Sequence, residues 1–261
     1  MDRTNIEKIA RNAEDKMLLA KVWDKVNNGM VRNIPAHTGF LSPRELEMTR
    51  YLFGDVPGLH AFGGFADSER KMLCYLPEYL DENFLMEDDS PVVCLSAQFY
   101  EGDTPTHRDF LGALMGSGIA REAVGDICVG TGRCDFFVTE EIAPYLLHNF
   151  TNAGRTKFHL SAIPLKAAQI PEQEVKVIKD TLASMRLDSV VSAGFRIARN
   201  AAAQMIAAGK VAIDGLPCEK SDKNISEGAT ISLRGSGKIK LVKVNGQTKK
   251  GRISVEIHRY L

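Results

Sequence analysis

The segment from Met185 to Gly215 constrains the fold of this chain more than any other stretch. Its apolar residues recur at helical spacing twice, first at Leu187, Val190 and Val191 and then at Ala202, Met205 and Ile206. Gly209 follows at a position where a helix would end on a left-handed residue. Val211 and Ile213 then alternate as in a strand, and Asp214-Gly215 is a strong hairpin signal. The segment therefore predicts two short helices, a strand and a tight turn.

The polar positions of the same segment carry the cations Arg186, Arg196, Arg199 and Lys210. Two packed helices with several cations on one side would form a phosphate-binding face. The chain as a whole has a formal net charge of zero, but from Ser184 onward there are 14 Lys and Arg against 6 Asp and Glu. This asymmetry indicates a basic module with a polyanionic partner. A lysine-rich solvated strand surface is the alternative explanation.

The motifs RLD, GFRIAR and GKVAIDG, which begin at Arg186, Gly194 and Gly209, resemble the S4 RNA-binding domain. The chain as a whole resembles the YlmH-type S4-domain proteins, which are bacterial ribosome-associated factors linked to quality control of stalled translation. The resemblance is strongest over residues 185–260, weaker over 92–165 and weakest before 60. It implies a domain that grips folded RNA by shape, through phosphates and riboses, with its two-helix face.

The resemblance also implies which residues contact RNA. The positions that match the S4 pattern are Arg186, Ser192, Arg196, Arg199, Asn200, Gln204 and Lys210, and Lys220 and Lys223 extend the footprint. The sequence departs from the family at Ala198, where a serine usually precedes the arginine that opens the second helix. A hydroxyl that would cap this helix or contact RNA is therefore missing, and Asn200 is the alternative cap.

Residues 1–88 are expected to form an N-terminal α/β subdomain. Ile6 to Ala20 predicts one amphipathic helix, and Ser42-Pro43-Arg44-Glu45 has the spacing of a capping box that opens a second. Strand patterns follow on either side of a turn. A stretch that resembles the close of the first domain in the YlmH-type family contains Gly63, Gly64, Phe65, Glu69 and Arg70. Relief of backbone crowding is the alternative explanation for its glycines.

Residues 89–171 predict a central domain of the ferredoxin-like, RRM-like βαββαβ arrangement. Thr104-Pro105 is expected to cap its first helix. The aromatic signature that lets such domains stack bases is absent, and Phe136-Phe137 should point to opposite faces of a strand. Glu172 to Ser184 predicts a helix that links to or begins the S4 domain, which is placed at 182–261. The whole chain is thus assigned to the α+β class.

Cysteine usage and hydropathy limit the remaining options. The five cysteines are scattered and form no CxxC pair, so we expect reduced thiols and neither a metal nor another cofactor. The N-terminus does not resemble a signal peptide, and no apolar run approaches membrane-spanning length. We therefore expect a cytoplasmic protein without a membrane partner.

Three motifs suggest catalysis and are better explained otherwise. His107-Arg108-Asp109 matches a kinase catalytic loop, but the phosphate-binding glycine loop is missing. Gly125 to Gly132 opens no helix and is not a nucleotide fingerprint. Pseudouridine synthases carry their catalytic aspartate in an RLD triplet, but Asp188 lies inside the S4-like segment, where we expect it to pair with Arg186 or another nearby cation.

Together these observations predict a non-enzymatic RNA-binding protein without a small-molecule substrate, acting as a monomer. The resemblance implies that it binds ribosomal RNA of the large subunit, contacts peptidyl-tRNA and assists the rescue of stalled nascent chains. An S4-targeted RNA-modifying enzyme of the pseudouridine synthase type is the second hypothesis. An enzyme should show convergent polar residues of perturbed ionisation in a pocket of its front half.

Overall fold

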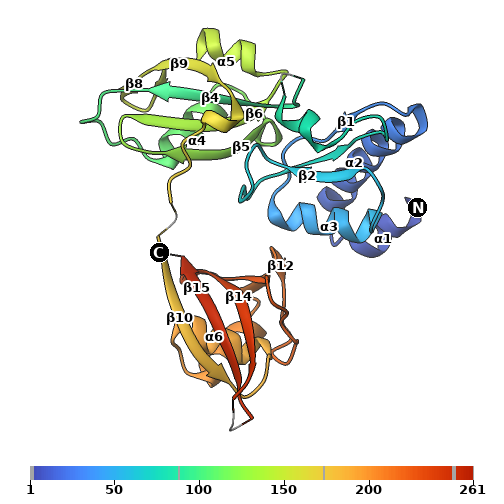
Figure 1. The fold of residues 1–261 in the computed structure, drawn as a ribbon, viewed down its shortest axis with the longest axis vertical. Coiled ribbons are helices and arrows are strands. Elements are labelled where there is room, and N and C mark those ends of the chain that lie inside the picture. Colours follow the sequence, from blue (N-terminus) through green and yellow to red (C-terminus); the bar gives the residue numbers. More distant parts are fainter. Residues whose placement is uncertain (1–2, 88, 173, 249–250, 261) are drawn as a thin grey trace. The chain divides into compact units, whose positions relative to one another are not determined.

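The computed structural model describes residues 3–87, 89–172, 174–248 and 251–260 (Figure 1). The chain divides into two compact units, Met1–Pro171 and Glu172–Leu261, which we describe separately. Lys249 and Lys250, which add to the basic charge of the second unit, lie outside the described residues, as do the expected domain limits at 1, 88 and 261. Within the described residues, no helix has both the length and the apolar character needed to cross a membrane.

The first unit begins with helices packed on a small antiparallel sheet of order β1-β3-β2. Its elements, with short 3-10 helices written η, are η1 (Arg3–Asn5), α1 (Ile6–Ile9), α2 (Ala13–Arg32), β1 (Ala36–His37), α3 (Pro43–Phe53), β2 (Leu59–Phe62), β3 (Met72–Tyr75) and η2 (Glu82–Met86). The capping box predicted at Ser42 and Glu45 is confirmed.

The single helix predicted from Ile6 to Ala20 is wrong. The chain leaves the helix after Ile9 and starts a new one at Ala13, because the Asn12 side chain accepts a hydrogen bond from the Asp15 amide at 2.8 Å. Asparagine competes with the backbone for such bonds and so favours a helix start over a helix interior. The buried Asp15 carboxylate also binds Arg44 of α3, with 2.6 Å between Oδ2 and Nη2.

The second part of this unit has the predicted βαββαβ order. Its four-stranded antiparallel sheet runs β5-β6-β4-β9, as in ferredoxin-like folds. The elements are β4 (Val92–Gln98), α4 (His107–Gly116), η3 (Arg121–Ala123), β5 (Val124–Val129), β6 (Arg133–Thr139), α5 (Ala143–Asn149), β7 (Asn152–Ala153), β8 (Thr156–Lys157), β9 (His159–Ile163) and η4 (Leu165–Ala167). Thr106 rather than Thr104 caps α4, in a reciprocal pair with Asp109.

Both faces of the four-stranded sheet are covered. Phe110, Leu114 and Leu146 from α4 and α5 pack on one face, where Phe136 is buried. On the other face Phe137 is buried in a cluster with residues of the preceding elements, which include Phe40, Met72 and Cys74. The prediction that adjacent phenylalanines point to opposite faces is confirmed. The sheet surface on which RNA-recognition modules stack bases is therefore filled by the N-terminal part of the chain.

The stretch from Gly63 to Arg70 makes this covering possible. Gly64 has φ +96°, and a Cβ there would lie 2.3 Å from the Phe137 ring, so only glycine fits. The Phe65 ring lies 5.1 Å from that of Phe137. The half-buried Arg70 guanidinium donates to the carbonyls of Phe40, at 2.7 Å, and Val124, at 3.0 Å. This stretch therefore joins the two parts of the unit.

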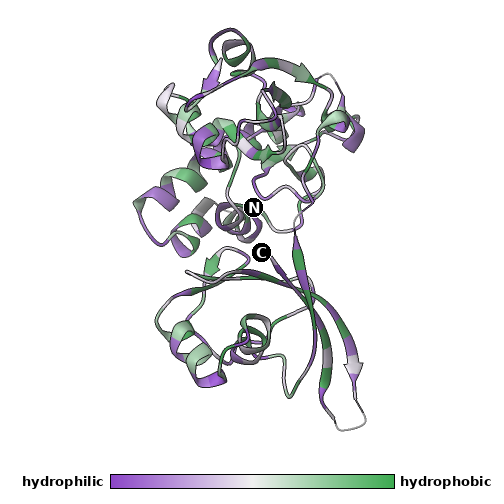
Figure 2. Ribbon diagram, turned by 90° about the vertical axis from the view of Figure 1, so that its left-hand side faces the viewer, coloured by the Kyte–Doolittle hydropathy of each residue, from purple (hydrophilic) through white to green (hydrophobic). Residues whose placement is uncertain are grey.

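The second unit is a six-stranded antiparallel sheet of order β10-β15-β14-β13-β11-β12 with two helices on one side (Figures 1 and 2). Its elements are β10 (Val175–Leu182), α6 (Leu187–Phe195), α7 (Arg199–Ala207), β11 (Val211–Ile213), β12 (Leu216–Pro217), β13 (Thr230–Leu233), β14 (Gly237–Gln247) and β15 (Ile253–Tyr260). The two helices, the strand and the Asp214-Gly215 turn predicted from the sequence are all present.

The helix predicted over Glu172 to Ser184 is wrong. Residues Val175–Leu182 form β10, which pairs with β15 from Val175 opposite Tyr260 to Leu182 opposite Ile253. The two residues that β10 buries, Ile178 and Leu182, are four positions apart. That spacing fits one face of a helix as well as one face of a strand. The strand belongs to the second unit although it begins before residue 182, where the S4 domain was expected to begin.

Candidate nucleic-acid interface

Helices α6 and α7 are fixed on the sheet by a shared apolar core. Leu187, Val190 and Val191 of α6 and Ala202 and Ile206 of α7 are fully buried in it. α6 approaches the sheet closely, since a Cβ on Gly194 would lie 2.4 Å from Ile239 Cδ1. With their apolar sides inward, the helices expose the polar positions that the sequence singled out.

Arg186 and Arg199 converge on one carboxylate. Arg186 donates to both oxygens of Asp188, with Nε 3.3 Å from Oδ1 and Nη2 3.2 Å from Oδ2. Arg199 Nη2 lies 3.1 Å from Oδ1. The Asp188 side chain is 7% exposed, whereas those of Arg186 and Arg199 are 42% and 49% exposed. The pairing expected for Asp188 is confirmed, and both guanidinium groups stay accessible.

The charge state of Asp188 follows from this geometry. Burial raises the pKa of the carboxyl, but the hydrogen bonds from Arg199 and Arg186 outweigh burial and leave the pKa below its ordinary value. Asp188 is therefore ionised at neutral pH, and it neutralises part of the arginine charge. An aspartate enclosed in this way is poorly placed to attack a base.

The turn between the helices presents Arg196. This residue ends α6 in the left-handed conformation, with φ +55°, and its side chain is exposed. Ser192 holds the turn, because its hydroxyl donates to the Ile197 carbonyl at 2.7 Å. The Ser192 hydroxyl is thus engaged by the protein itself, and its contact with RNA stays a prediction.

Helix α7 opens without a side-chain cap. Its N-cap residue is Ala198, and within the described residues the exposed Asn200 side chain makes no hydrogen bond that replaces the missing serine. The first amides of a helix attract anions when no side chain satisfies them. Arg199 therefore lies at a helix end that itself favours phosphate.

A loop brings Lys220 and Lys223 to the start of α6. The amide of Leu187 donates to the Lys223 carbonyl at 2.8 Å, and that of Asp188 donates to the Ser221 carbonyl at 3.0 Å. Both lysine side chains are exposed. Arg186, Arg199 and this loop thus form one cationic group, which we call the Asp188 cluster: Arg186, Asp188, Arg199, Lys220 and Lys223.

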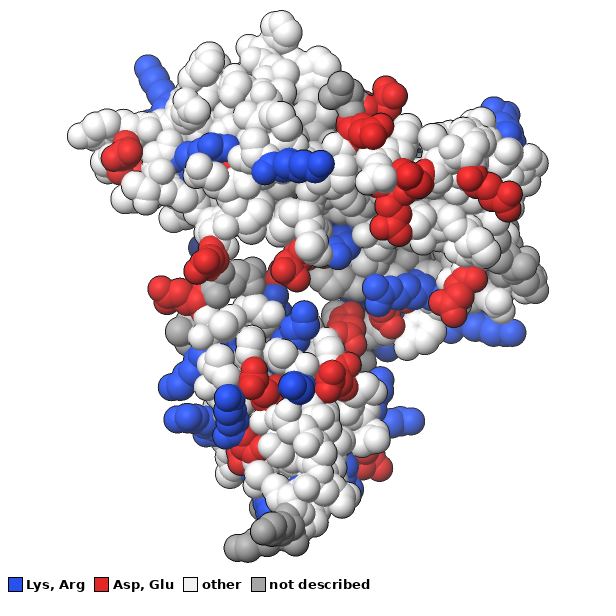
Figure 3. Space-filling model, in the orientation of Figure 1, with Lys and Arg blue, Asp and Glu red and all other residues white. Residues whose placement is uncertain are grey.

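Gln204 and Lys210 lie farther along the chain, on α7 and just after it, and both are exposed. Arg234, which was not among the predicted contacts, lies beside Lys210, since its amide donates to the Lys210 carbonyl at 3.0 Å. Arg259 lies near the α6–α7 turn, with its guanidinium 5.5 Å from the Phe195 ring centre. In the sequence, only the high density of cations after Ser184 points to Arg234 and Arg259 as part of this surface. Figure 3 shows cations and acids interspersed on the visible face of this unit.

Three charged groups of shifted pKa lie at the joint between the two parts of the first unit: Arg70, Arg121 and Asp126. Burial lowers the pKa of Arg70 and that of Arg121, and burial raises the pKa of Asp126. The partners of these groups are main-chain atoms: Arg70 binds carbonyls, and Asp126 accepts from the amides of Glu69 and Arg70. Burial also lowers the pKa of His107. Packing between the two parts of the first unit therefore explains these shifts in pKa.

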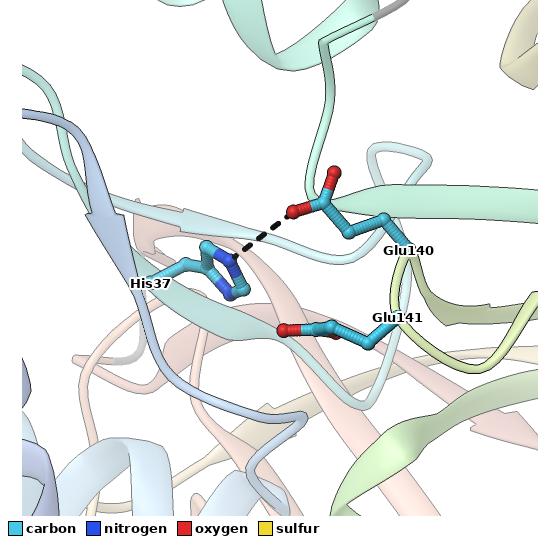
Figure 4. Close-up of side chains that lie close together, drawn as sticks. All are labelled: His37, Glu140 and Glu141. Atoms are coloured by element: carbon cyan, nitrogen blue, oxygen red, sulfur yellow. Dashed lines mark ion pairs between the residues drawn. The ribbon is translucent and has the colours of Figure 1, made fainter.

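A group of possible metal ligands lies elsewhere in the first unit, with His37 on β1 and Glu140 and Glu141 before α5 (Figure 4). Their ligand atoms lie within 4.8 Å of one another, and His37 Nε2 is 3.9 Å from Glu140 Oε1. Both carboxylates are exposed, and exposed acidic groups commonly gather without an ion. The contact between the His37 imidazole and Glu140 explains why these side chains lie together, and we assign no metal to them.

Comparison with known proteins identifies the family. Residues 98–167 match the family model described as "Putative RNA-binding domain in YlmH", and residues 185–231 match that of the S4 domain. Ribosome-associated protein quality control protein P2 of Bacillus subtilis (strain 168) is 31% identical over 224 residues, which cover 85% of this chain and 86% of that protein. The chain belongs to the YlmH family of S4-domain proteins. Neither matched region of this YlmH-family chain includes β10.

A solved YlmH structure agrees with the fold. Cell division protein ylmH from Streptococcus pneumoniae superposes with a TM-score of 0.51 at 20% identity, over 62% of this chain and 98% of that one. At this identity the likeness concerns the fold alone.

Proposed function

We propose that this YlmH-family chain is a non-enzymatic RNA-binding factor that binds ribosomal RNA of the large subunit through the α6–α7 face. The observation that carries the proposal is the Asp188 cluster, in which two half-exposed guanidinium groups share a carboxylate and the main chain of the same segment contacts a loop with two exposed lysines. Arginine forks bind phosphate in two-pronged hydrogen bonds, and structured RNA is recognised largely through its backbone.

The relative supplies the biological setting of the proposal. The Bacillus protein is named as ribosome-associated and as part of protein quality control. We extend this role to the chain: it binds the large subunit in the cytoplasm, contacts peptidyl-tRNA and assists rescue of stalled nascent chains. The covered sheet of the first unit cannot offer a base-stacking platform, so this unit would contact its partners through other surfaces.

The alternative, an RNA-modifying enzyme of the pseudouridine synthase type, requires an aspartate that reaches the target base. Asp188 is the aspartate of the RLD triplet, and it is buried and bound by two arginines. In the first unit, Arg70 and Asp126, whose pKa values are shifted by burial, bind main-chain atoms at a joint. These two observations favour the binding factor.

Co-sedimentation of the full chain with purified ribosomes tests the proposal. Replacing Arg196 and Arg199 together by alanine should weaken binding about tenfold and lower the slope of log affinity against log salt by about two, because each arginine is expected to neutralise one phosphate. The control K176A/K243A removes the same charge from exposed positions on β10 and β14. Unchanged binding of the R196A/R199A variant in moderate salt would refute the assignment of this face.

A further inference from the structure

One buried carboxylate binds two arginines, one just before α6 and one at the start of α7. Asp188 Oδ1 accepts from Arg186 Nε at 3.3 Å and from Arg199 Nη2 at 3.1 Å. The two nitrogens are therefore no farther apart than the sum of those distances, although the residues come from different helices. Asp188 itself is fixed by the loop, since its amide donates to the Ser221 carbonyl at 3.0 Å.

This arrangement leaves donors free for a ligand. A guanidinium has five N–H donors, of which Arg186 directs groups on two nitrogens and Arg199 on one nitrogen toward Asp188. Both side chains remain about half exposed, so a ligand can reach them. Without the carboxylate, two flexible side chains of like charge would repel each other and would lose more conformational entropy on binding.

We propose that Asp188 is a positioning residue for RNA binding, which orders Arg186 and Arg199 in the free protein so that both engage phosphates together. The inference rests on the function proposed above. The carboxylate repels phosphate directly, so any gain in affinity from it must act through the two arginines. Direct repulsion of phosphate and positioning of the arginines change the affinity in opposite directions. The direction of the change when Asp188 is replaced therefore shows which effect dominates.

The test measures binding of the full chain to purified large ribosomal subunits over a range of salt concentrations. Asp188→Asn removes one negative charge, which raises the net charge of the face by one, and it also removes the ionic anchor of the two arginines. Charge alone predicts tighter binding, whereas positioning predicts binding weaker by about tenfold and a shallower salt dependence. Asp222→Asn is the matched control, because it makes the same charge change in the adjacent loop. Within the described residues, the exposed Asp222 forms no ion pair with either arginine.

The outcomes separate this inference from the proposed function. Weaker binding by D188N, with equal or tighter binding by D222N, supports positioning. Binding by D188N as tight as that of the parent overturns positioning, and the function still stands if R196A/R199A loses affinity. Unaltered binding by R196A/R199A overturns both the positioning role of Asp188 and the proposed function.

Thermal unfolding shows whether each variant folds. Should D188N fail to fold, Asp188→Glu keeps the charge but moves the carboxylate by one methylene, and a loss of a few fold is expected. Affinity equal to that of the parent overturns the inference. If neither variant folds, the carboxylate serves the fold itself, which also overturns a role specific to binding.

Discussion

At Asp188 a single side chain links stability to the charge of the candidate interface. The carboxylate lies among apolar residues of α6 yet stays ionised because two arginines bind it. The sequence predicted the pairing with Arg186 from their proximity. It could not predict Arg199 as the second partner, since that contact spans eleven positions and depends on how α6 and α7 cross.

The pH dependence of stability should reveal this carboxylate. Its pKa is lower in the folded protein than in the unfolded chain, so its contribution is complete above the unfolded value and is lost as the pH falls through the folded one. We expect D188N to unfold more easily than the parent at pH 7, by about 1.5 to 3 kcal/mol. Urea unfolding from pH 7 to 3 measures both proteins. A difference that does not shrink below about pH 4 would contradict the ionic explanation.

A second residue-scale prediction concerns Gly64. Alanine there must adopt φ +96° and bring its Cβ against the Phe137 ring. We expect G64A to lower the free energy of unfolding by about 2 to 4 kcal/mol, through strain and overpacking. Gly112 on α4 is the control, because a Cβ there would meet no atom of the described residues within 4 Å, and alanine there should stabilise slightly. Equal stability of G64A and G112A in urea would refute the close packing of Gly64 against Phe137.

At the scale of elements, the sequence predicted what local signals determine. Apolar periodicity located α6 and α7, and the capping box located the start of α3. Two errors arose where a local signal was ambiguous. The periodicity around Asn12 predicted a helix interior although this residue starts α2, and the spacing of Ile178 and Leu182 concealed β10. Pairing with β15, which is distant in sequence, decides the second case.

The missing cap of α7 gives a prediction for one element. Ala198 already has the extended conformation of an N-cap, with φ −61° and ψ 142°. Serine there should accept a hydrogen bond from an amide of the first turn and stabilise the protein by about 0.5 to 1 kcal/mol. A203S, inside the helix, should instead be neutral or slightly destabilising. Thermal unfolding compares them, and an A198S variant no more stable than A203S would count against a vacant cap.

At the scale of the whole molecule, the chain consists of a basic S4 unit and a first unit in which two expected domains form one compact body. The sequence could predict the βαββαβ order, because each strand and helix carries its own pattern. It could not show that Phe137 is covered by residues such as Phe40 and Met72, since this packing joins segments far apart in the chain.

The covering of the sheet can be tested with the cysteines. Burial raises the pKa of Cys74 and that of Cys128 to about 12, and Cys94 lies in the same cluster. In the native chain we expect a thiol reagent at pH 8 to modify the partly exposed Cys218 first. A chain that lacks residues 1–88 should expose Cys94 and Cys128, which would then react rapidly. Mass spectrometry of the labelled peptides measures this, and slow labelling of both in the truncated chain would contradict the covering.

The pairing of β10 with β15 has a consequence for how this protein can be divided. The region recognisable as S4 begins at residue 185, yet a fragment cut there would leave the main-chain groups of β15 unsatisfied along one flank. An unpaired strand edge of this kind favours pairing with other chains and therefore aggregation. The smallest autonomous piece is therefore larger than the stretch that matches the S4 model, and it includes the strand that connects the S4 fold to the preceding residues.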